Sequence, residues 1–392
     1  MPSIISRLTG GRANAPSETK TAQTLFTLTG GGGASWTGRG YASLAGEGYR
    51  KNPVVYRCVR MIAEAAGRVP LAVREGGRTH AEHPLVDLLR RPNPHRTGVD
   101  LLETVFAHLQ TAGNAYLEAA VSGGEIRGLY VLRPDRMRVV AGADGWPVAY
   151  SYTAGGRVRR LPLDPDPVPR VLHLTLFHPL DDHYGLAPLE AAGMSLDVHN
   201  AASRWNKALL DNAARPSGAL VYSAQAGNLT PAQFDRLKAE LETGFQGAAN
   251  AGRPMVLEGG LDWKTLALSP RDMDFIEAKN AAAREIALAF GVPPMLLGIP
   301  GDNTFANYAE ANRSLWRQTV VPLVNRASAA LGAWLSPAFG DDLTLIPDLD
   351  AIEALAEDRT AKWNRIANAD FLSDVEKRQL LGIPPAARPP AR

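Results

Sequence analysis

The chain has 392 residues, of which 45% are hydrophobic, and this length predicts a substantial core in more than one domain. The 42 lysine and arginine residues nearly balance the 40 acidic residues, and the net charge of +2 lacks the excess typical of proteins that grip DNA phosphates. The single cysteine, Cys58, excludes an intrachain disulfide and fits a reducing cytosol.

Residues 1–50 differ from the rest in their content of Gly, Ser and Thr, with four consecutive glycines at 30–33. Five basic residues against two acidic ones give this segment a charge of +3. It is expected to be a flexible, mildly basic arm. Its first residues lack the apolar core of a signal peptide, and no apolar run approaches the roughly 20 residues of a membrane span. We therefore expect a chain that is soluble and intracellular at synthesis, with no membrane partner.

Residues 51–187 combine helical and strand patterns. Apolar residues at helical spacing predict a helix from Asn52 to Gly67, with Cys58 as a packing residue, and a second helix over 98–112. A strand is expected at 70–73. Five further short β segments are separated by Gly, Pro and Asp-Gly turns: 115–121, 126–132, 137–141, 147–153 and 168–176. The fold class predicted for this region is α+β.

In the middle of the chain, two helical segments, 188–214 and 272–291, bracket a small βαββ module at 215–271. Within the module we expect strands at 218–222, 255–257 and 261–268 and a helix at 230–244. Residues 292–305 form a long loop rich in Pro and Gly. A long helix over 306–335 follows, with a bend expected at Pro322. Residues 343–392 should hold one strand, two short helices and a Pro/Arg-rich end.

The best metal-like cluster is His178, Asp181, Asp182 and His183, because imidazole and carboxylate groups at close spacing can hold a divalent ion. A Pro- and Gly-bounded turn contains such residues for ordinary reasons. Neither a phosphate-binding loop ending in Gly-Lys-Ser/Thr nor a Gly-x-Ser-x-Gly elbow occurs. We therefore predict no catalytic residue, no metal and no cofactor. A metal-dependent hydrolase using this cluster and a sequence-specific DNA-binding regulator are the alternatives.

Four groups of residues, in order along the chain, resemble the portal protein family of long-tailed bacteriophages, which includes the portals of bacterial gene transfer agents. The first is 52–59 with 69–71, and the second is 83–89 with 91–94 and 113–116. The third is 184–189, and the fourth is 257–264 with 285–287, 290–294 and 306–310. The glycine-rich arm and the short chain after 335 depart from the family pattern.

The resemblance implies a portal fold and a ring of twelve subunits at one capsid vertex, through which double-stranded DNA is packaged and ejected. Its implied parts are a wing (51–187 and 306–351), two stem helices (188–214 and 272–291), a clip (215–271), a tunnel loop (292–305) and a reduced crown (352–392). The implied partners are further copies of the chain, the terminase large subunit, the major capsid protein, a head–tail adaptor and double-stranded DNA without sequence specificity.

These parts give a set of expected site residues. The tunnel loop would present Gly301, Asp302, Asn303, Thr304, Phe305 and Asn307 to DNA. The stem would line the channel with Asp272, Asp274, Glu277, Lys279, Arg284 and Glu285, and the clip would dock through Glu258, Asp262, Trp263 and Lys264.

Charge counting agrees with a conduit. The segment 272–291 carries −2 and the segment 188–214 carries −1. Such a stem would repel phosphate, and weak contact favours sliding because each tight phosphate contact adds a barrier. The apolar stripe on the second helix consists of Met273, Ile276, Ala283, Ala287 and Phe290. It has two open interpretations: packing against a neighbouring subunit or within its own.

Overall fold

The computed structural model describes residues 37–38, 40–80, 82–164, 166–211, 218–222, 261–265, 275–300, 305–340 and 343–381, with residues 230, 232–233, 235–236 and 239. The chain divides into two compact units. The larger holds Ala34–Lys207 and Met273–Arg392, and the smaller includes Ala208–Asp272. Each is described by itself.

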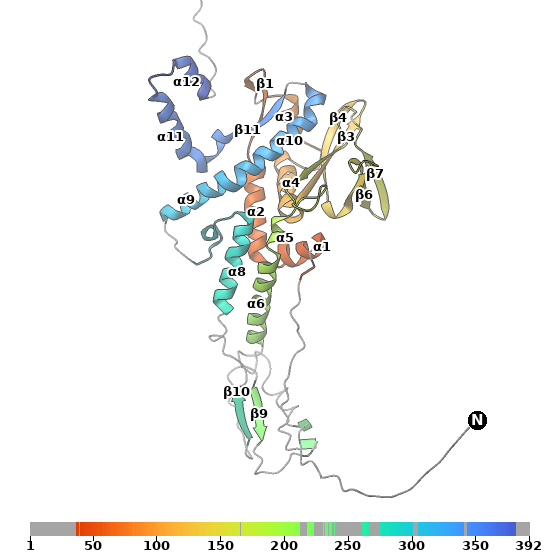
Figure 1. The fold of residues 1–392 in the computed structure, drawn as a ribbon, viewed down its shortest axis with the longest axis vertical. Helices are drawn as coiled ribbons and strands as arrows, with labels where there is room; N and C mark the ends of the chain where they lie inside the picture. Colours follow the sequence, from red (N-terminus) through yellow and green to blue (C-terminus); the bar gives the residue numbers. More distant parts are fainter. Residues whose placement is uncertain are drawn as a thin grey trace, which may run out of the picture. The chain divides into compact units, whose positions relative to one another are not determined.

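Two helices, α2 (Pro53–Gly67) and α4 (Gly98–Ala112), form the centre of the larger unit (Figure 1). Asn52 caps α2 with its side chain, and Thr97 and Asp100 form a capping box at the start of α4. Their apolar faces are buried against each other, including Cys58. Both predicted helices are confirmed, because caps and apolar spacing are local signals.

Two three-stranded antiparallel sheets follow in the chain, and the first of them packs against α4. One has the order β4-β3-β8, with β3 at Asn114–Ser122, β4 at Glu125–Leu132 and β8 at Val171–Thr175. The other has the order β5-β6-β7, with β5 at Met137–Ala141, β6 at Pro147–Ala154 and β7 at Arg157–Pro162. A second apolar cluster includes side chains of both sheets: Tyr116, Leu132, Met137, Tyr150, Leu161 and Val171.

A third sheet, β11-β1-β2, joins distant parts of the chain. It contains β1 (Leu71–Glu75), β2 (Arg78–His80) and β11 (Thr344–Pro347), and Val73 pairs with Leu345. The helices α3 (Pro84–Arg90) and α10 (Val321–Phe339) lie near this sheet. The sequence patterns predicted β1 and the strand near 344 but missed β2, β7 and α3.

The helical segments differ in detail from expectation. The helix expected over 188–214 is two helices, α5 (Pro188–Ala191) and α6 (Gly193–Asp211), and the one expected over 272–291 is described as α8 (Phe275–Phe290). The long helix after the loop consists of α9 (Phe305–Leu315), the π-helical turn η6 (Trp316–Val320) and α10. The π turn η6 ends two residues before Pro322, where a bend was expected, and the bend itself stays a prediction.

The remaining elements are short connecting turns and the helices near the two ends of the chain. The 3-10 turns η5 (Pro294–Leu297), η2 (Pro134–Arg136), η7 (Leu349–Ala351) and η8 (Glu353–Leu355) connect longer elements. The C-terminal part holds α11 (Ala356–Ala367) and α12 (Asp374–Leu380), as expected. At the other end, α1 (Tyr41–Leu44) and the π-helical turn η1 (Ala45–Tyr49) bury Leu44 in the core. The expectation that the arm extends to residue 50 is therefore wrong from Tyr41 onward.

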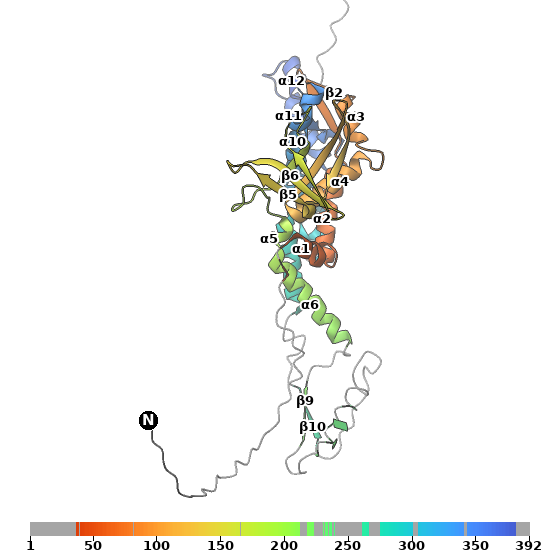
Figure 2. The same ribbon diagram turned by 90° about the vertical axis from the view of Figure 1, so that its right-hand side faces the viewer.

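In the smaller unit, β9 (Gly218–Tyr222) and β10 (Leu261–Thr265) form an antiparallel pair in which Leu220 faces Trp263 (Figure 2). Residues 232–233, 235–236 and 239 are helical, within the helix expected at 230–244. The strand expected at 255–257 lies outside the described residues. Throughout the described ranges, no helix combines the length and apolar character required to cross a membrane.

Candidate functional site

Helices α6 and α8, expected to line a channel, run side by side (Figure 1). A side-chain hydrogen bond joins them. The Ser195 hydroxyl donates to Glu285 Oε2 at 2.6 Å. Glu285 is exposed and Ser195 is half-buried, so this bond links the helices near their surface. It gives one of the expected channel residues a definite partner on the other helix.

A buried polar network attaches α6 to the start of α2. The Asn52 amide donates to Asn200 Oδ1 at 2.9 Å and lies 3.0 Å from His199 Nδ1. Asn200 in turn donates to the Glu47 carbonyl at 3.0 Å. Burial, followed by the nearby charge of Lys279, lowers the pKa of His199. A neutral ring allows Nδ1 to accept from Asn52, so these contacts hold α6 in a fixed position.

The structure corrects the net charge expected on the channel side of the stem, because Asp197 is buried. Its side chain is only 6% exposed, although the sequence count included it as a channel charge. Both carboxylate oxygens accept from the Thr37 backbone N–H at 3.2 Å, and one also accepts from the Thr37 hydroxyl. The carboxylate therefore holds the chain entering α1 and is not available to repel DNA.

The expected channel residues on α8 show a mixed surface. Glu277, Arg284 and Glu285 are exposed, and Lys279 is half-buried. These two acids and two bases give the described helix no net charge. The expected value of −2 depends on Asp272 and Asp274, which lie outside the described residues. Arg284 also donates to the Pro300 carbonyl, which ties the helix to the loop that follows it.

The apolar stripe on α8 divides into two parts. Ala283, Ala287 and Phe290 are buried within the same subunit. This agrees with one of the two interpretations of the stripe, packing within its own subunit. Ile276 is 72% exposed, and Met273 lies outside the described residues. Leu288, which the stripe did not include, is also exposed, so α8 keeps uncovered apolar surface.

The expected tunnel-loop residues are only partly described. Gly301, Asp302, Asn303 and Thr304 lie outside the described residues. Phe305 begins α9, and Asn307 lies exposed on its first turn. The described first part of the loop contains η5, followed by Gly298 at a φ of 71°.

Three of the four expected docking residues of the insert lie on one strand. Asp262, Trp263 and Lys264 are consecutive on β10 and pair with β9. Because side chains alternate along a strand, Trp263 lies on one face and the two charged residues on the other. Glu258 lies outside the described residues.

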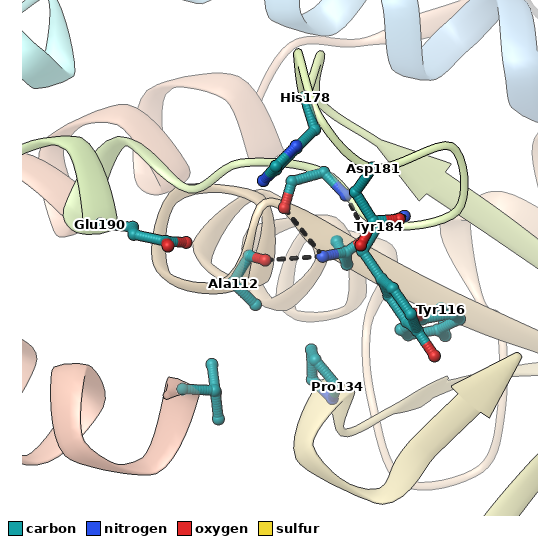
Figure 3. A pocket seen from close by; sticks show the side chains of 10 residues that line it. Ala112, Tyr116, Pro134, His178, Asp181, Tyr184 and Glu190 are labelled. Atoms are coloured by element: carbon teal, nitrogen blue, oxygen red, sulfur yellow. Dashed lines mark hydrogen bonds between the residues drawn. The ribbon is translucent and has the colours of Figure 1, made fainter. Parts of the chain in front are cut away.

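The histidine–aspartate cluster closes a turn beside a small pocket of about 290 Å³ (Figure 3). Asp181 Oδ1 accepts from the backbone N–H groups of His183 and Tyr184 at 2.8 and 2.9 Å, and these bonds lower the pKa of Asp181. His178 Nδ1 accepts from the Leu180 N–H at 3.0 Å. In the described ranges, no three or more His, Cys, Asp or Glu side chains are placed to hold a metal. The ordinary explanation, a polar turn bounded by Pro and Gly, therefore accounts for the presence of these residues.

A buried polar cluster that sequence reasoning missed supports this turn. Asn114 Oδ1 accepts from the Gly185 N–H at 2.9 Å and lies 2.9 Å from His173 Nε2. The other ring nitrogen lies 3.3 Å from the Tyr150 hydroxyl, and the Tyr116 ring stacks on the imidazole at 4.1 Å. Burial lowers the pKa of His173 to about 4, so the ring is neutral. The spacing of Asn114 and Gly185 in the sequence contains no signal for their contact.

This cluster brings together two stretches on which the family resemblance depends, 113–116 and 184–189. The network around Asn52 brings a third stretch against α6. The resemblance therefore rests on residues that contact each other and position α5 and α6.

Comparisons with known proteins agree with this arrangement. The family model "Phage portal protein" matches residues 53–382. An uncharacterized protein of Rickettsia bellii is 44% identical over 339 residues, covering 86% of this chain and 88% of its own length. A probable portal protein of Streptomyces phage phiC31 is 27% identical, covering 79% and 70%.

A solved structure extends the comparison to three dimensions. A chain in the neck of a native gene transfer agent (GTA) particle, with C12 symmetry, is 55% identical and has a TM-score of 0.69. The match covers 91% of this chain and 97% of that one. With the family model covering the chain from the start of α2 to the end of α12, the protein belongs to the phage portal protein family, a family of structural proteins of virions and phage-like particles.

Proposed function

We propose that this chain is one subunit of a closed ring of twelve at a single vertex of a phage-like particle, through which double-stranded DNA enters and leaves. The observation that carries the proposal is the 55% identity, over 91% of this chain, to a chain of a GTA neck with C12 symmetry. A cyclic ring uses one head-to-tail interface repeatedly, so one kind of subunit suffices.

The proposed parts follow the expected division of the chain. Residues 51–187 and 306–351 form the wing, and the segments 188–214 and 272–291 form the stem. The fixed attachment of α6 to α2 supports a rigid stem, because Asn52, His199 and Asn200 are all buried. The tunnel loop at 292–305 follows α8 directly and would project toward DNA through residues 301–305 and Asn307. Residues 352–392 form the reduced crown.

The near-neutral surface of α8 supports a conduit that slides on DNA. Glu277 and Glu285 are opposed by Lys279 and Arg284, so the described helix offers few uncompensated positive charges to phosphate. Weak, sequence-independent contact allows passage, whereas several tight contacts would hold the duplex. Asp272 and Asp274 would add repulsion at the start of the segment.

The proposed partners are the terminase large subunit, the major capsid protein and a head–tail adaptor. The insert at 215–271 would bind the terminase large subunit first and the head–tail adaptor later. Its docking surface would include Glu258, Asp262, Trp263 and Lys264. No observation favours a hydrolase, since the residues of the proposed metal cluster cap a turn.

The mass and shape of the purified particle test this proposal. Twelve subunits of 42.0 kDa give roughly 500 kDa in a closed ring. Native mass spectrometry and negative-stain images of the same sample should show this mass and rings with an open centre. A monomer or dimer that persists at high concentration would contradict the proposal.

A further inference from the structure

Positive charge is concentrated on the sheet β5-β6-β7. Residues 136–162 contain five arginines and one aspartate, a net charge of +4, whereas the whole chain carries +2. The rest of the chain therefore carries a net negative charge. A local excess of this kind produces a positive potential over one surface of an otherwise balanced protein.

The strand register separates these arginines onto two faces. Met137 pairs with Tyr152, which pairs with Arg159, and this row lies on the face that contributes to the apolar cluster. The next row holds Arg138, Ser151 and Arg160 and therefore lies on the opposite face. Two strand spacings separate the two arginines, about 10 Å between their Cα atoms. We call this opposite face the arginine face, defined by Arg138, Ser151, Thr153 and Arg160.

The two classes of arginine differ in their partners. Arg159 donates to the buried Glu118 at 2.6 Å, and Arg170 donates to the same carboxylate at 3.1 Å. Arg138 and Arg160 are exposed and have no ion-pair partner among the described residues. The rows of the arginine face contain no acidic residue. Their charges are therefore available to a ligand.

The chemistry of this face matches phosphate. Guanidinium groups and Ser and Thr hydroxyls are among the groups that donate to the DNA backbone. Arg138 and Arg160 supply the charge, and Ser151 and Thr153 supply hydroxyls between and beside them. A protein partner would favour an apolar anchor at the centre, whereas a polar row of Arg, Ser and Arg occupies the centre of this face. The exposed large apolar residue on the face, Val158, lies in the next row, opposite Thr153.

We propose that the arginine face binds the phosphate backbone of double-stranded DNA outside the channel, without reading its sequence. This second DNA contact rests on the proposed function, because it assigns a surface of the wing to the DNA of the same particle. It differs from the channel in purpose: the channel passes DNA, and the arginine face holds it.

A closed circular duplex separates the two contacts, because it cannot thread a ring that is already closed. Assembled rings are isolated by mass and titrated with a relaxed plasmid at several salt concentrations. The test variant is Arg138→Ala/Arg160→Ala. The control is Arg74→Ala/Arg78→Ala, which removes the same charge from exposed positions on β1 and β2.

In Arg138→Ala/Arg160→Ala, each subunit in contact with DNA loses two phosphate contacts. Plasmid affinity should fall about tenfold per contacting subunit at 0.1 M salt. The slope of log affinity against log salt concentration should decrease in magnitude by about 2 for each such subunit. The control should bind as the wild type does. Equal binding by both double variants and the wild type would overturn the proposal, and so would equal weakening of both. A failure to form rings would instead contradict the proposed function, since it is seen before any DNA is added.

Poly-L-glutamate serves as the probe for an acidic protein partner. Polyglutamate binding that depends on Arg138 and Arg160, with plasmid binding unchanged in the double variant, would overturn the DNA proposal and assign the face to protein. Plasmid binding that depends on both arginines supports the proposal as stated.

Discussion

Gly113 and Gly185 approach so closely that neither has room for a side chain. A Cβ on Gly113 would lie 2.3 Å from the Gly185 carbonyl oxygen, and a Cβ on Gly185 would lie 2.2 Å from the Gly113 oxygen. Gly113 also ends α4 with a φ of 67°, in the left-handed region. The contact joins the end of α4 to the segment entering α5.

Gly113→Ala should therefore destabilise the protein by about 4 kcal/mol or more, because strain and a backbone clash combine. Gly123→Ala is the matched control: Gly123 has a φ of 63°, and nothing lies within 4 Å of the added carbon. The control should lose only about 1–2 kcal/mol. Urea unfolding of both variants measures the difference, and equal losses would contradict the role given to the contact.

Glu118 should contribute more to stability than either of its arginines. Its carboxylate is buried, whereas the side chains of Arg159 and Arg170 are half-exposed. Glu118→Ala leaves two cations without their partner and should cost about 2–3 kcal/mol, less than for a fully buried pair. Arg159→Ala leaves Arg170 on the carboxylate and should cost about 1 kcal/mol. Thermal melting compares them, and a larger loss for Arg159→Ala would count against this order.

His108 should make the fold sensitive to mild acid. Burial lowers the pKa of His108 to about 4, below the ordinary value of 6.5, and no described residue forms a hydrogen bond with its Nδ1. The unfolded chain then binds the proton more readily, so stability present above pH 6.5 is lost as pH falls toward 4. The full effect is on the order of 3 kcal/mol.

His108→Leu should remove much of this pH dependence, because leucine neither titrates nor leaves a buried polar atom. Urea midpoints at pH 7 and pH 5 measure it, with the exposed His95→Leu as the control. The stability of His108→Leu should fall less between the two pH values than that of the wild type. An unchanged difference would show that His108 does not carry the effect.

Cys58 should be unreactive in the native protein. The thiol is fully buried in α2, and burial raises its pKa to about 12. Because it is the only cysteine, a thiol reagent reports on this position alone. Labelling at pH 8 should be at least about 100-fold slower than in 8 M urea. Rapid native labelling would mean that α2 opens readily.

The sequence alone predicted the elements whose signals are local. The apolar residues of α2 and α4 recur at regular helical spacing, so both helices were expected nearly to the residue. The α+β class followed from the same patterns. β7 was missed because five of its six residues are exposed and it lacks alternation; pairing with β6 makes it a strand.

Tertiary structure decided which side chains are available to a partner. Asp197 looks like a surface charge in the sequence, yet Thr37, 160 residues away, covers and binds it. Arg159 and Arg160 are neighbours in the chain, but the pleat of β7 sends one to Glu118 and leaves the other in solvent. Local sequence determined the type and limits of elements with regular apolar spacing, such as α2 and α4. Burial depends on contacts between residues far apart in the chain, and the folded structure alone specifies them.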